Sequence, residues 1–121
     1  MMNIIFGSEQ AKQIGEKYVV LELDTFQFGV DGPVETAYCV VDNVPFDQIP
    51  EIPTLKEAHI QMIEKYKTRE WYGSKELTEE LYGKWNGELD TFYDEMIKRL
   101  EENASSEPSE NWSHVIIKDA S

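Results

Sequence analysis

Residues 19–41, VVLELDTFQFGVDGPVETAYCVV, decide the fold that we expect for this chain. In the first half, Val and Leu residues alternate with Glu22 and Asp24, as in a strand with one buried face. The DGP triplet at 31–33 is typical of a turn, and the residues after it are rich in β-branched and aromatic types. The stretch therefore predicts a β-hairpin whose strands are each about eight residues long or longer.

A short strand and a short helix are expected before the hairpin. Residues 3–6, NIIF, are apolar enough for a strand. Gly7-Ser8 then offers an N-cap for a brief helix, which Gly15 is well placed to end. The strand can join the hairpin through a short crossover like that of a βαβ unit, with the direction of pairing left open. We expect a small antiparallel-rich sheet over residues 3–41.

The segment after the hairpin, NVPFDQIPEIPT at 43–54, contains three prolines. Proline has no N–H group to donate to a sheet, so we expect an extended connector here. Phe46, Ile49 and Ile52 are its apolar residues, and they are expected to pack against the domain.

Helical spacing of apolar residues predicts two long helices between about 55 and 101. Thr54 is a suitable N-cap for the first, and Gly73-Ser74 is typical of a helix end followed by a new start, which predicts an αα-hairpin. The second stripe keeps its phase across Asn86-Gly87, so we favour one helix there, kinked or straight, over two. The stripes are Leu55, Ala58, His59, Met62, Ile63 and Tyr66, and then Leu77, Leu81, Trp85, Leu89, Phe92, Met96 and Leu100.

The C-terminal part is expected to differ from the rest. Residues 1–102 read as a single α+β domain, 103–111 as an acidic flexible linker, and 112–121 as an apolar tail. Trp112 and the following Val and Ile residues are too apolar to remain in water. The tail is therefore expected to add a strand to its own sheet or to that of a neighbouring subunit.

Composition excludes several classes of function. The chain has 121 residues, with 11 Lys and Arg against 24 Asp and Glu, so its net charge is −13. Such a surface repels phosphate and anionic lipid, so we expect neither a nucleic-acid nor a membrane partner. No apolar stretch approaches the roughly 18 residues of a membrane span, and residues 1–6 do not resemble a signal peptide. We expect a cytoplasmic protein in which Cys39 is a small buried apolar residue.

The front of the chain also resembles an enzyme family. IIFGS, ending at Ser8, and the later Glu22-Leu23-Asp24 are similar to the opening signature of the polymerase-beta-like nucleotidyltransferases. The resemblance implies that Gly7 and Ser8 contact a triphosphate, that Glu22 and Asp24 bind two Mg²⁺ ions, and that Asp42 is the third acid. Residue chemistry agrees, because a Gly-Ser turn presents N–H groups to phosphate and carboxylates two apart on a strand can share metal ions.

A simpler interpretation is favoured for these residues. Glu22 and Asp24 then form the solvated face of a strand, and no catalytic residue, metal or cofactor is expected. His59 lacks the helical spacing of metal ligands and is expected at the boundary of the core. His114 lies among apolar residues and is expected in a strand. The carboxylates of the last helix are read as a solvated face: Glu88, Asp90, Asp94 and Glu95.

A second resemblance covers Gly83 to Leu100, GKWNGELDTFYDEMIKRL. This segment is similar to the C-terminal helix of small acidic proteins from marine cyanobacteria and their phages, which implies a setting but no activity. The matching residues are Gly83, Trp85, Gly87, Glu88, Asp90, Phe92 and Tyr93.

We therefore expect a non-catalytic protein–protein interaction protein that forms a homo-oligomer or binds another protein. The aromatic residues of the helices and tail are too many for one narrow stripe, and exposed aromatic residues gather at interfaces. The alternative is a metal-dependent, nucleotide-processing enzyme that uses Ser8, Glu22, Asp24 and Asp42 with Mg²⁺. The interface candidates are Trp71, Tyr72, Tyr82, Trp85, Tyr93 and Trp112.

Overall fold

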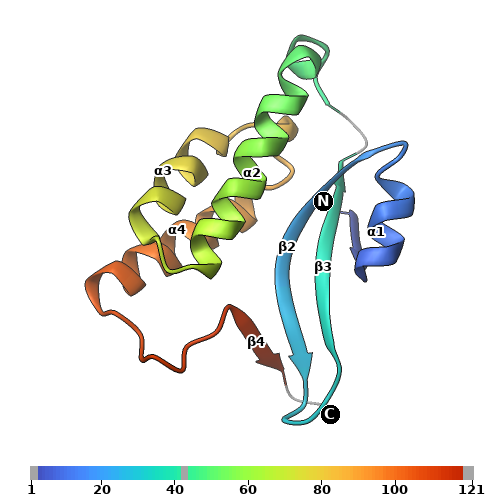
Figure 1. The fold of residues 1–121 in the computed structure, drawn as a ribbon. Helices are drawn as coiled ribbons and strands as arrows, with labels where there is room; N and C mark the ends of the chain where they lie inside the picture. Colours follow the sequence, from blue (N-terminus) through green and yellow to red (C-terminus); the bar gives the residue numbers. More distant parts are fainter. Residues whose placement is uncertain (1–2, 42–43, 119–121) are drawn as a thin grey trace.

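The computed structural model describes residues 3–41 and 44–118, and within them the chain forms an α+β fold with four α-helices and a four-stranded mixed sheet (Figure 1). The expected α+β class is confirmed. In chain order the elements are β1 (Asn3–Phe6), α1 (Ser8–Ile14), β2 (Val19–Phe28), β3 (Val34–Val41), η1 (Phe46–Glu51), α2 (Ile52–Lys67), α3 (Trp71–Leu81), η2 (Trp85–Gly87), α4 (Asp90–Ser105) and β4 (Val115–Lys118), where η marks a 3-10 helix.

The sheet has the strand order β1-β3-β2-β4. β3 pairs antiparallel with both β1 and β2, which confirms the hairpin. β1 is separated from β2 by β3, so the crossover through α1 skips one strand position. The C-terminal strand pairs parallel with β2 of its own chain, from Thr25 to Phe28. The tail therefore completes the sheet from within the molecule.

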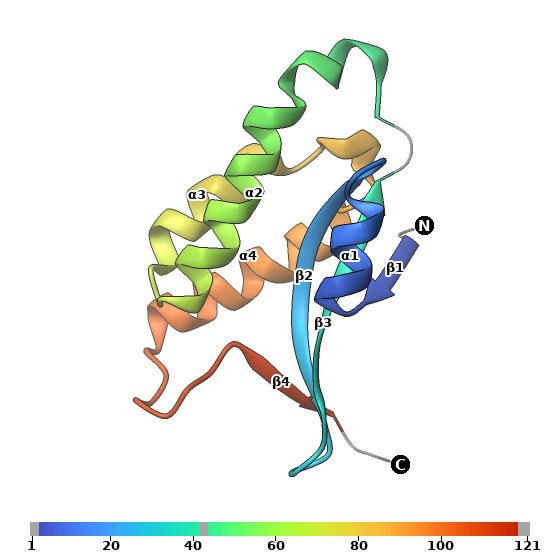
Figure 2. The ribbon, with the colours of Figure 1, turned by 45° about the vertical axis from the view of Figure 1, so that its right-hand side comes forward.

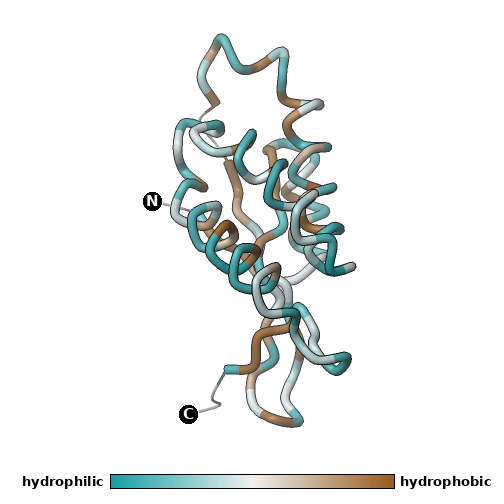
Figure 3. Tube along the Cα trace, turned by 90° about the vertical axis from the view of Figure 1, so that its left-hand side faces the viewer, coloured by the Kyte–Doolittle hydropathy of each residue, from teal (hydrophilic) through white to brown (hydrophobic). Residues whose placement is uncertain are grey.

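The two faces of the sheet are covered unequally. Helices α2, α3 and α4 lie on one face, and the small helix α1 lies on the other (Figures 1 and 2). Polar and apolar residues alternate along the helices, as expected for helices with one buried side (Figure 3). The predicted stripes provide most of the core, which contains Leu21, Leu23, Ala37, Cys39, Val41, Leu55, Met62, Ile63, Tyr66, Trp71, Leu81, Trp85, Leu89, Phe92, Tyr93, Met96 and Leu100.

A β-bulge interrupts the alternation that predicted β2. Glu22 lies opposite Tyr38 and Thr25 lies opposite Thr36, so two residues of β2 face a single residue of β3. A bulge changes the direction of the side chains that follow it. The prediction that Glu22 and Asp24 share one solvated face is therefore wrong, and Asp24 reaches α4 instead.

The turn between the first two long helices lies earlier than predicted. Residues 68–70 form it, and Arg69 adopts a positive φ of 68° there. Gly73 and Ser74 instead lie inside α3, where α2 and α3 pack closely. A Cβ atom at Gly73 would lie 3.1 Å from the Lys65 side chain, and the buried Ser74 hydroxyl donates to the Met62 carbonyl oxygen at 2.9 Å. Small size, and not helix termination, explains this Gly-Ser pair.

The second long helix is broken, so the favoured single helix is wrong. α3 ends at Leu81 and α4 begins at Asp90, with a 3-10 turn between them. Asn86 and Gly87 both have a positive φ, of 57° and 74°, which a right-handed helix does not allow. The apolar stripe stays in phase because both helices and the turn face the same core.

The proline-rich connector is a 3-10 helix that leads directly into α2, and not an extended segment. Proline is tolerated in the first turn of a helix, where the backbone N–H has no helical partner. Pro53 occupies such a position in α2, whereas Pro50 lies inside the 3-10 helix. Phe46 is 90% exposed and does not hold the connector in place, whereas Ile52 packs on the core.

The tail after α4 is fixed at two points. Residues 103–105 continue α4, so the segment predicted to be a linker begins at residue 106 and not at residue 103. Arg69 then binds Glu107 at 2.9 Å and also donates to the carbonyl oxygens of Pro108 and Ser109. Trp112 lies edge-on against Tyr66 and Trp71, with ring centroids 5.5 and 5.1 Å apart. These contacts place β4 beside β2.

Replacing Trp112 by Ala is therefore expected to release β4. Loss of a partly buried indole should lower the free energy of unfolding by about 2 kcal/mol. Amide hydrogens of Val115–Lys118 should exchange faster with deuterium, while those of β3 stay protected. Trp112→Phe keeps an aromatic ring at this position and is the matched control. Unchanged exchange in Trp112→Ala would show that strand pairing alone holds the tail.

Candidate functional site

An apolar cleft lies between α4 and the sheet, at the side where β1 extends beyond the helices. Its volume is about 290 Å³. Ile4 and Phe6 of β1 form one side together with Phe26 of β2, and Phe92 lies on the α4 side. Among the described residues, helices α2, α3 and α4 do not cover β1 (Figure 2), and Ile4 is 49% exposed and Phe6 is 43% exposed. An apolar surface of this kind can receive apolar side chains of another molecule.

One end of the cleft is polar but already neutralised. The Arg99 guanidinium donates two hydrogen bonds to the carboxylate of Asp24, at 2.7 and 3.0 Å. These bonds raise the pKa of Arg99 above its usual value, against the opposing effect of burial. Glu95 also lines the cleft. The ion pair leaves no free cation for an anionic ligand, so the cleft favours apolar, uncharged contacts.

β1 is the last strand on its side of the sheet among the described residues. Its sequence, NIIF, contains neither a charged residue nor a proline. Natural proteins usually protect an edge strand with such residues, because its backbone can pair with another chain. Phe6 also contacts Phe28 across the sheet, with ring centroids 6.4 Å apart. The open edge and the cleft are therefore continuous. We call Ile4, Phe6 and the cleft beside them the β1 surface.

The segment of the chain that contains β1 carries no net charge. Residues 1–21 contain two acidic and two basic residues, so the entire net charge of −13 lies in residues 22–121. Both β1 and α1 fall within the neutral part. At physiological ionic strength, charges are screened beyond about 8 Å. Another molecule of the same charge can therefore approach the β1 surface with little local repulsion.

The residues of the nucleotidyltransferase resemblance do not gather at one site. Ser8 begins α1 and lines a shallow hollow on the other face of the sheet, beside Tyr38 and Val20. Glu22 is paired with Lys67 at 2.7 Å, and Asp24 is paired with Arg99. Asp42 lies outside the described residues. Within residues 3–41 and 44–118 no three His, Cys, Asp or Glu side chains are grouped as metal ligands. This geometry gives the enzyme alternative no support.

Most of the aromatic interface candidates are buried inside the molecule. Trp71, Trp85 and Tyr93 belong to the core, and Trp112 packs against it. Only Tyr72 and Tyr82 are exposed, at 74% and 45%. Trp71 packs against Tyr66 of α2 and Trp112 of the tail, and the Trp85 indole N–H donates to the Tyr93 hydroxyl, so these rings find partners within the chain. The residues that sequence reasoning missed are Ile4 and Phe6, whose only signal was an apolar strand without charges.

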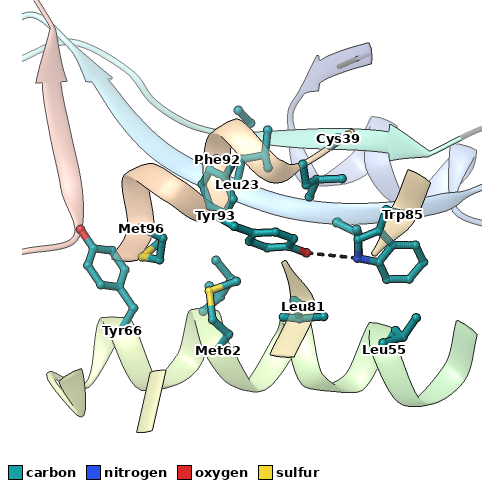
Figure 4. Close-up of a cluster of buried hydrophobic side chains, with 14 of the residues drawn as sticks. Leu23, Cys39, Leu55, Met62, Tyr66, Leu81, Trp85, Phe92, Tyr93 and Met96 are labelled. Carbon is teal, nitrogen blue, oxygen red and sulfur yellow. Dashed lines mark hydrogen bonds between the residues drawn. The ribbon is translucent and has the colours of Figure 1, made fainter. Parts of the chain in front are cut away.

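His59 was expected at the core boundary but is completely buried at its centre. Its Nε2 atom lies 2.6 Å from the carbonyl oxygen of Glu22, and its Nδ1 atom lies 2.9 Å from the hydroxyl of Tyr93. The Trp85 indole N–H donates to the same hydroxyl at 3.1 Å (Figure 4). The stick view shows Tyr93 between Trp85 and the apolar side chains of the core. These four groups form a continuous chain of hydrogen bonds.

The direction of this chain follows from its ends. A carbonyl oxygen only accepts, so the proton of neutral His59 is on Nε2, and Nδ1 accepts from the Tyr93 hydroxyl. Burial lowers the pKa of His59 to about 4, against the opposing effect of its hydrogen bond to Glu22. Burial also raises the pKa of Tyr93. Every polar atom of the chain is satisfied with both side chains neutral, which indicates a structural role.

His114 was expected in a strand but immediately precedes β4. Partial burial, and next the nearby Lys67, lower its pKa. The acidic residues of α4 have structural partners in two cases. Asp90 accepts a hydrogen bond from the Gly83 amide at 2.8 Å, and Asp94 lies 3.5 Å from the Tyr82 hydroxyl. They do not form a cation site among the described residues.

Comparison with protein-family models, with curated proteins and with solved structures found no match. The similarity of Gly83–Leu100 to small acidic proteins of marine cyanobacteria and phages therefore stays a prediction. No helix in the described part of the chain has both the length and the apolar character needed to cross a bilayer.

Proposed function

We propose that this chain is a non-catalytic protein–protein interaction protein that self-associates through the β1 surface. The observation that carries the proposal is an uncharged edge strand whose Ile4 and Phe6 side chains are about half exposed beside an apolar cleft. This surface combines two features of protein interfaces, an apolar centre and a strand at the end of the sheet among the described residues.

The location of the charge along the chain allows a second copy to occupy the β1 surface. Two molecules that each carry −13 repel one another over most of their surfaces. The neutral part, residues 1–21, is where that repulsion is smallest. A twofold axis beside β1 brings the neutral parts of the two copies together. Higher ionic strength should therefore strengthen the association.

If the chain self-associates through the β1 surface, the mass of the protein in solution should depend on Phe6. The unmodified chain should have the mass of a dimer in light scattering coupled to size-exclusion chromatography, and Phe6→Asp should shift it to the 14.0 kDa monomer. The reason is that an ionised carboxylate cannot be buried at an apolar contact without a partner. Circular dichroism should show that the variant keeps its helices.

Tyr72→Asp is the matched control, because it adds the same charge at an exposed aromatic residue on α3. It should leave the dimer intact. Dissociation by Tyr72→Asp, with no effect of Phe6→Asp, would place the contact on the helices. A monomeric mass of the unmodified chain at high concentration and high salt would overturn the proposal.

A further inference from the structure

Resting on the self-association proposed above, we propose that two copies pair β1 with β1 in antiparallel orientation and so form one continuous eight-stranded sheet. The strand order puts β1 at the end of the sheet, with β3 on its inner side. Antiparallel pairing of identical strands is what a twofold axis perpendicular to the sheet produces. The dimer would then have the same surface on both copies.

The other edges of the sheet are protected, and this contrast singles out β1. β4 covers β2 only from Thr25 to Phe28. Alongside the earlier part of β2 lies α2, whose His59 donates to the Glu22 carbonyl oxygen. On the opposite edge, β4 carries Lys118, a charged residue of the kind that discourages pairing. β1 has neither a covering helix on its outer side among the described residues nor a charge.

Apolar burial alone is too small to hold such a dimer. Complete burial of an Ile or Phe side chain contributes about 1.5–3 kcal/mol, and those of Ile4 and Phe6 are already half buried. The translational and rotational cost of association is about 4 kcal/mol or more. Backbone hydrogen bonds between the two strands supply the further stabilisation and also the specificity that apolar contacts lack.

The faces of the sheet determine the register. A twofold axis perpendicular to the sheet keeps the helix-bearing faces of both copies on one side, so a residue must lie opposite one of the same face. Ile4 and Phe6 line the cleft, and Ile5 therefore points to the α1 face. The register that pairs only apolar residues sets Ile4 opposite the partner's Phe6 and Ile5 opposite the partner's Ile5.

Cysteine cross-linking tests this register. The test uses a Cys39→Ala background, which removes the native thiol opposite Ile4. In the proposed register, a cysteine introduced at position 5 lies opposite the same residue of the second copy. Ile5→Cys should therefore form a disulfide-linked dimer on mild oxidation, seen as a band of twice the mass on a non-reducing gel. Ile4→Cys is the matched control one residue away, and it should remain largely monomeric because it faces the partner's Phe6.

The outcomes separate this inference from the proposed function. Efficient cross-linking at position 4 and not at position 5 would overturn the register. A dimeric mass of the unmodified protein with no cross-link at either position would overturn β1 pairing but leave self-association standing. A monomeric mass that becomes a complex only when a strand-forming peptide of another sequence is added would overturn both, because the edge would then serve a different protein.

Discussion

Replacing Tyr93 by Phe is expected to lower the free energy of unfolding by about 2–6 kcal/mol, although only one oxygen atom is removed. The hydroxyl accepts the Trp85 indole N–H and donates to Nδ1 of His59. Without it, two polar atoms at the centre of the core have no partner, and each costs about 1–3 kcal/mol. Domains of this size are stable by about 5–15 kcal/mol, so the loss is a large fraction of the total.

Urea unfolding of the variant, followed by tryptophan fluorescence and circular dichroism, measures this loss. Tyr82→Phe is the control, because its hydroxyl lies at the surface, 3.5 Å from Asp94. The control should change the midpoint little. If both variants unfold at the same urea concentration as the unmodified chain, the hydrogen-bond chain through Tyr93 does not stabilise the core.

Acidification is expected to destabilise the protein between pH 6.5 and about pH 4 because of His59. Its pKa is about 4 in the folded state and 6.5 when exposed. In this window the unfolded chain binds a proton that the folded protein does not, so the free energy of unfolding falls as the pH falls. The lowered pKa corresponds to a loss of about 3 kcal/mol across the window, and above pH 6.5 this contribution is fully present.

The control for the acid effect is His59→Gln. A glutamine amide can donate to the Glu22 carbonyl and accept from Tyr93, but it does not titrate in this range. Urea unfolding at several pH values should show a flatter pH dependence for His59→Gln than for the unmodified chain. His114→Gln measures the smaller contribution of the same sign from the second histidine. Equal slopes in all three proteins would contradict the assignment to His59.

Local patterns predicted the elements well where one physical rule dominates. The period-two alternation before the turn at 31–33 predicts the hairpin, because a half-buried strand must alternate. Helical stripes predict which side chains are buried: Leu81, Trp85, Met96 and Leu100 are all in the core. The stripes do not predict whether a helix is unbroken, because a stripe shows only which residues face the core. The break between α3 and α4 preserves that property.

The helix turns were misplaced because glycine has more than one use. Gly73 is small where α2 and α3 approach closely, whereas the turn at 68–70 uses Arg69 in a conformation that glycine usually adopts. A sequence shows that a residue is small, but not which neighbour requires the space. The extended connector was wrong for a related reason, since proline disfavours strands and yet suits the first turn of a helix.

The candidate site was the least predictable part. If each helix packed against a single neighbour, aromatic residues on several of its sides would include exposed side chains. However, α3 packs against two helices, α2 and α4. Conversely, Ile4 looks like a core residue and is half exposed, because the helices do not extend over β1. Exposure depends on which elements pack together, and that depends on the whole chain.

By itself, the sequence determined the α+β class, the hairpin, the apolar stripes, the acidic surface and the neutrality of residues 1–21, because each follows from composition or from a local period. Only the tertiary structure decided that His59 is central, that Asp24 meets Arg99 across the bulge, and that β1 lies at an open edge beside a cleft. His59 and Tyr93 are 34 positions apart in the sequence, and Asp24 and Arg99 are 75 positions apart. Contacts between residues so far apart arise only when strand order and helix packing are set together.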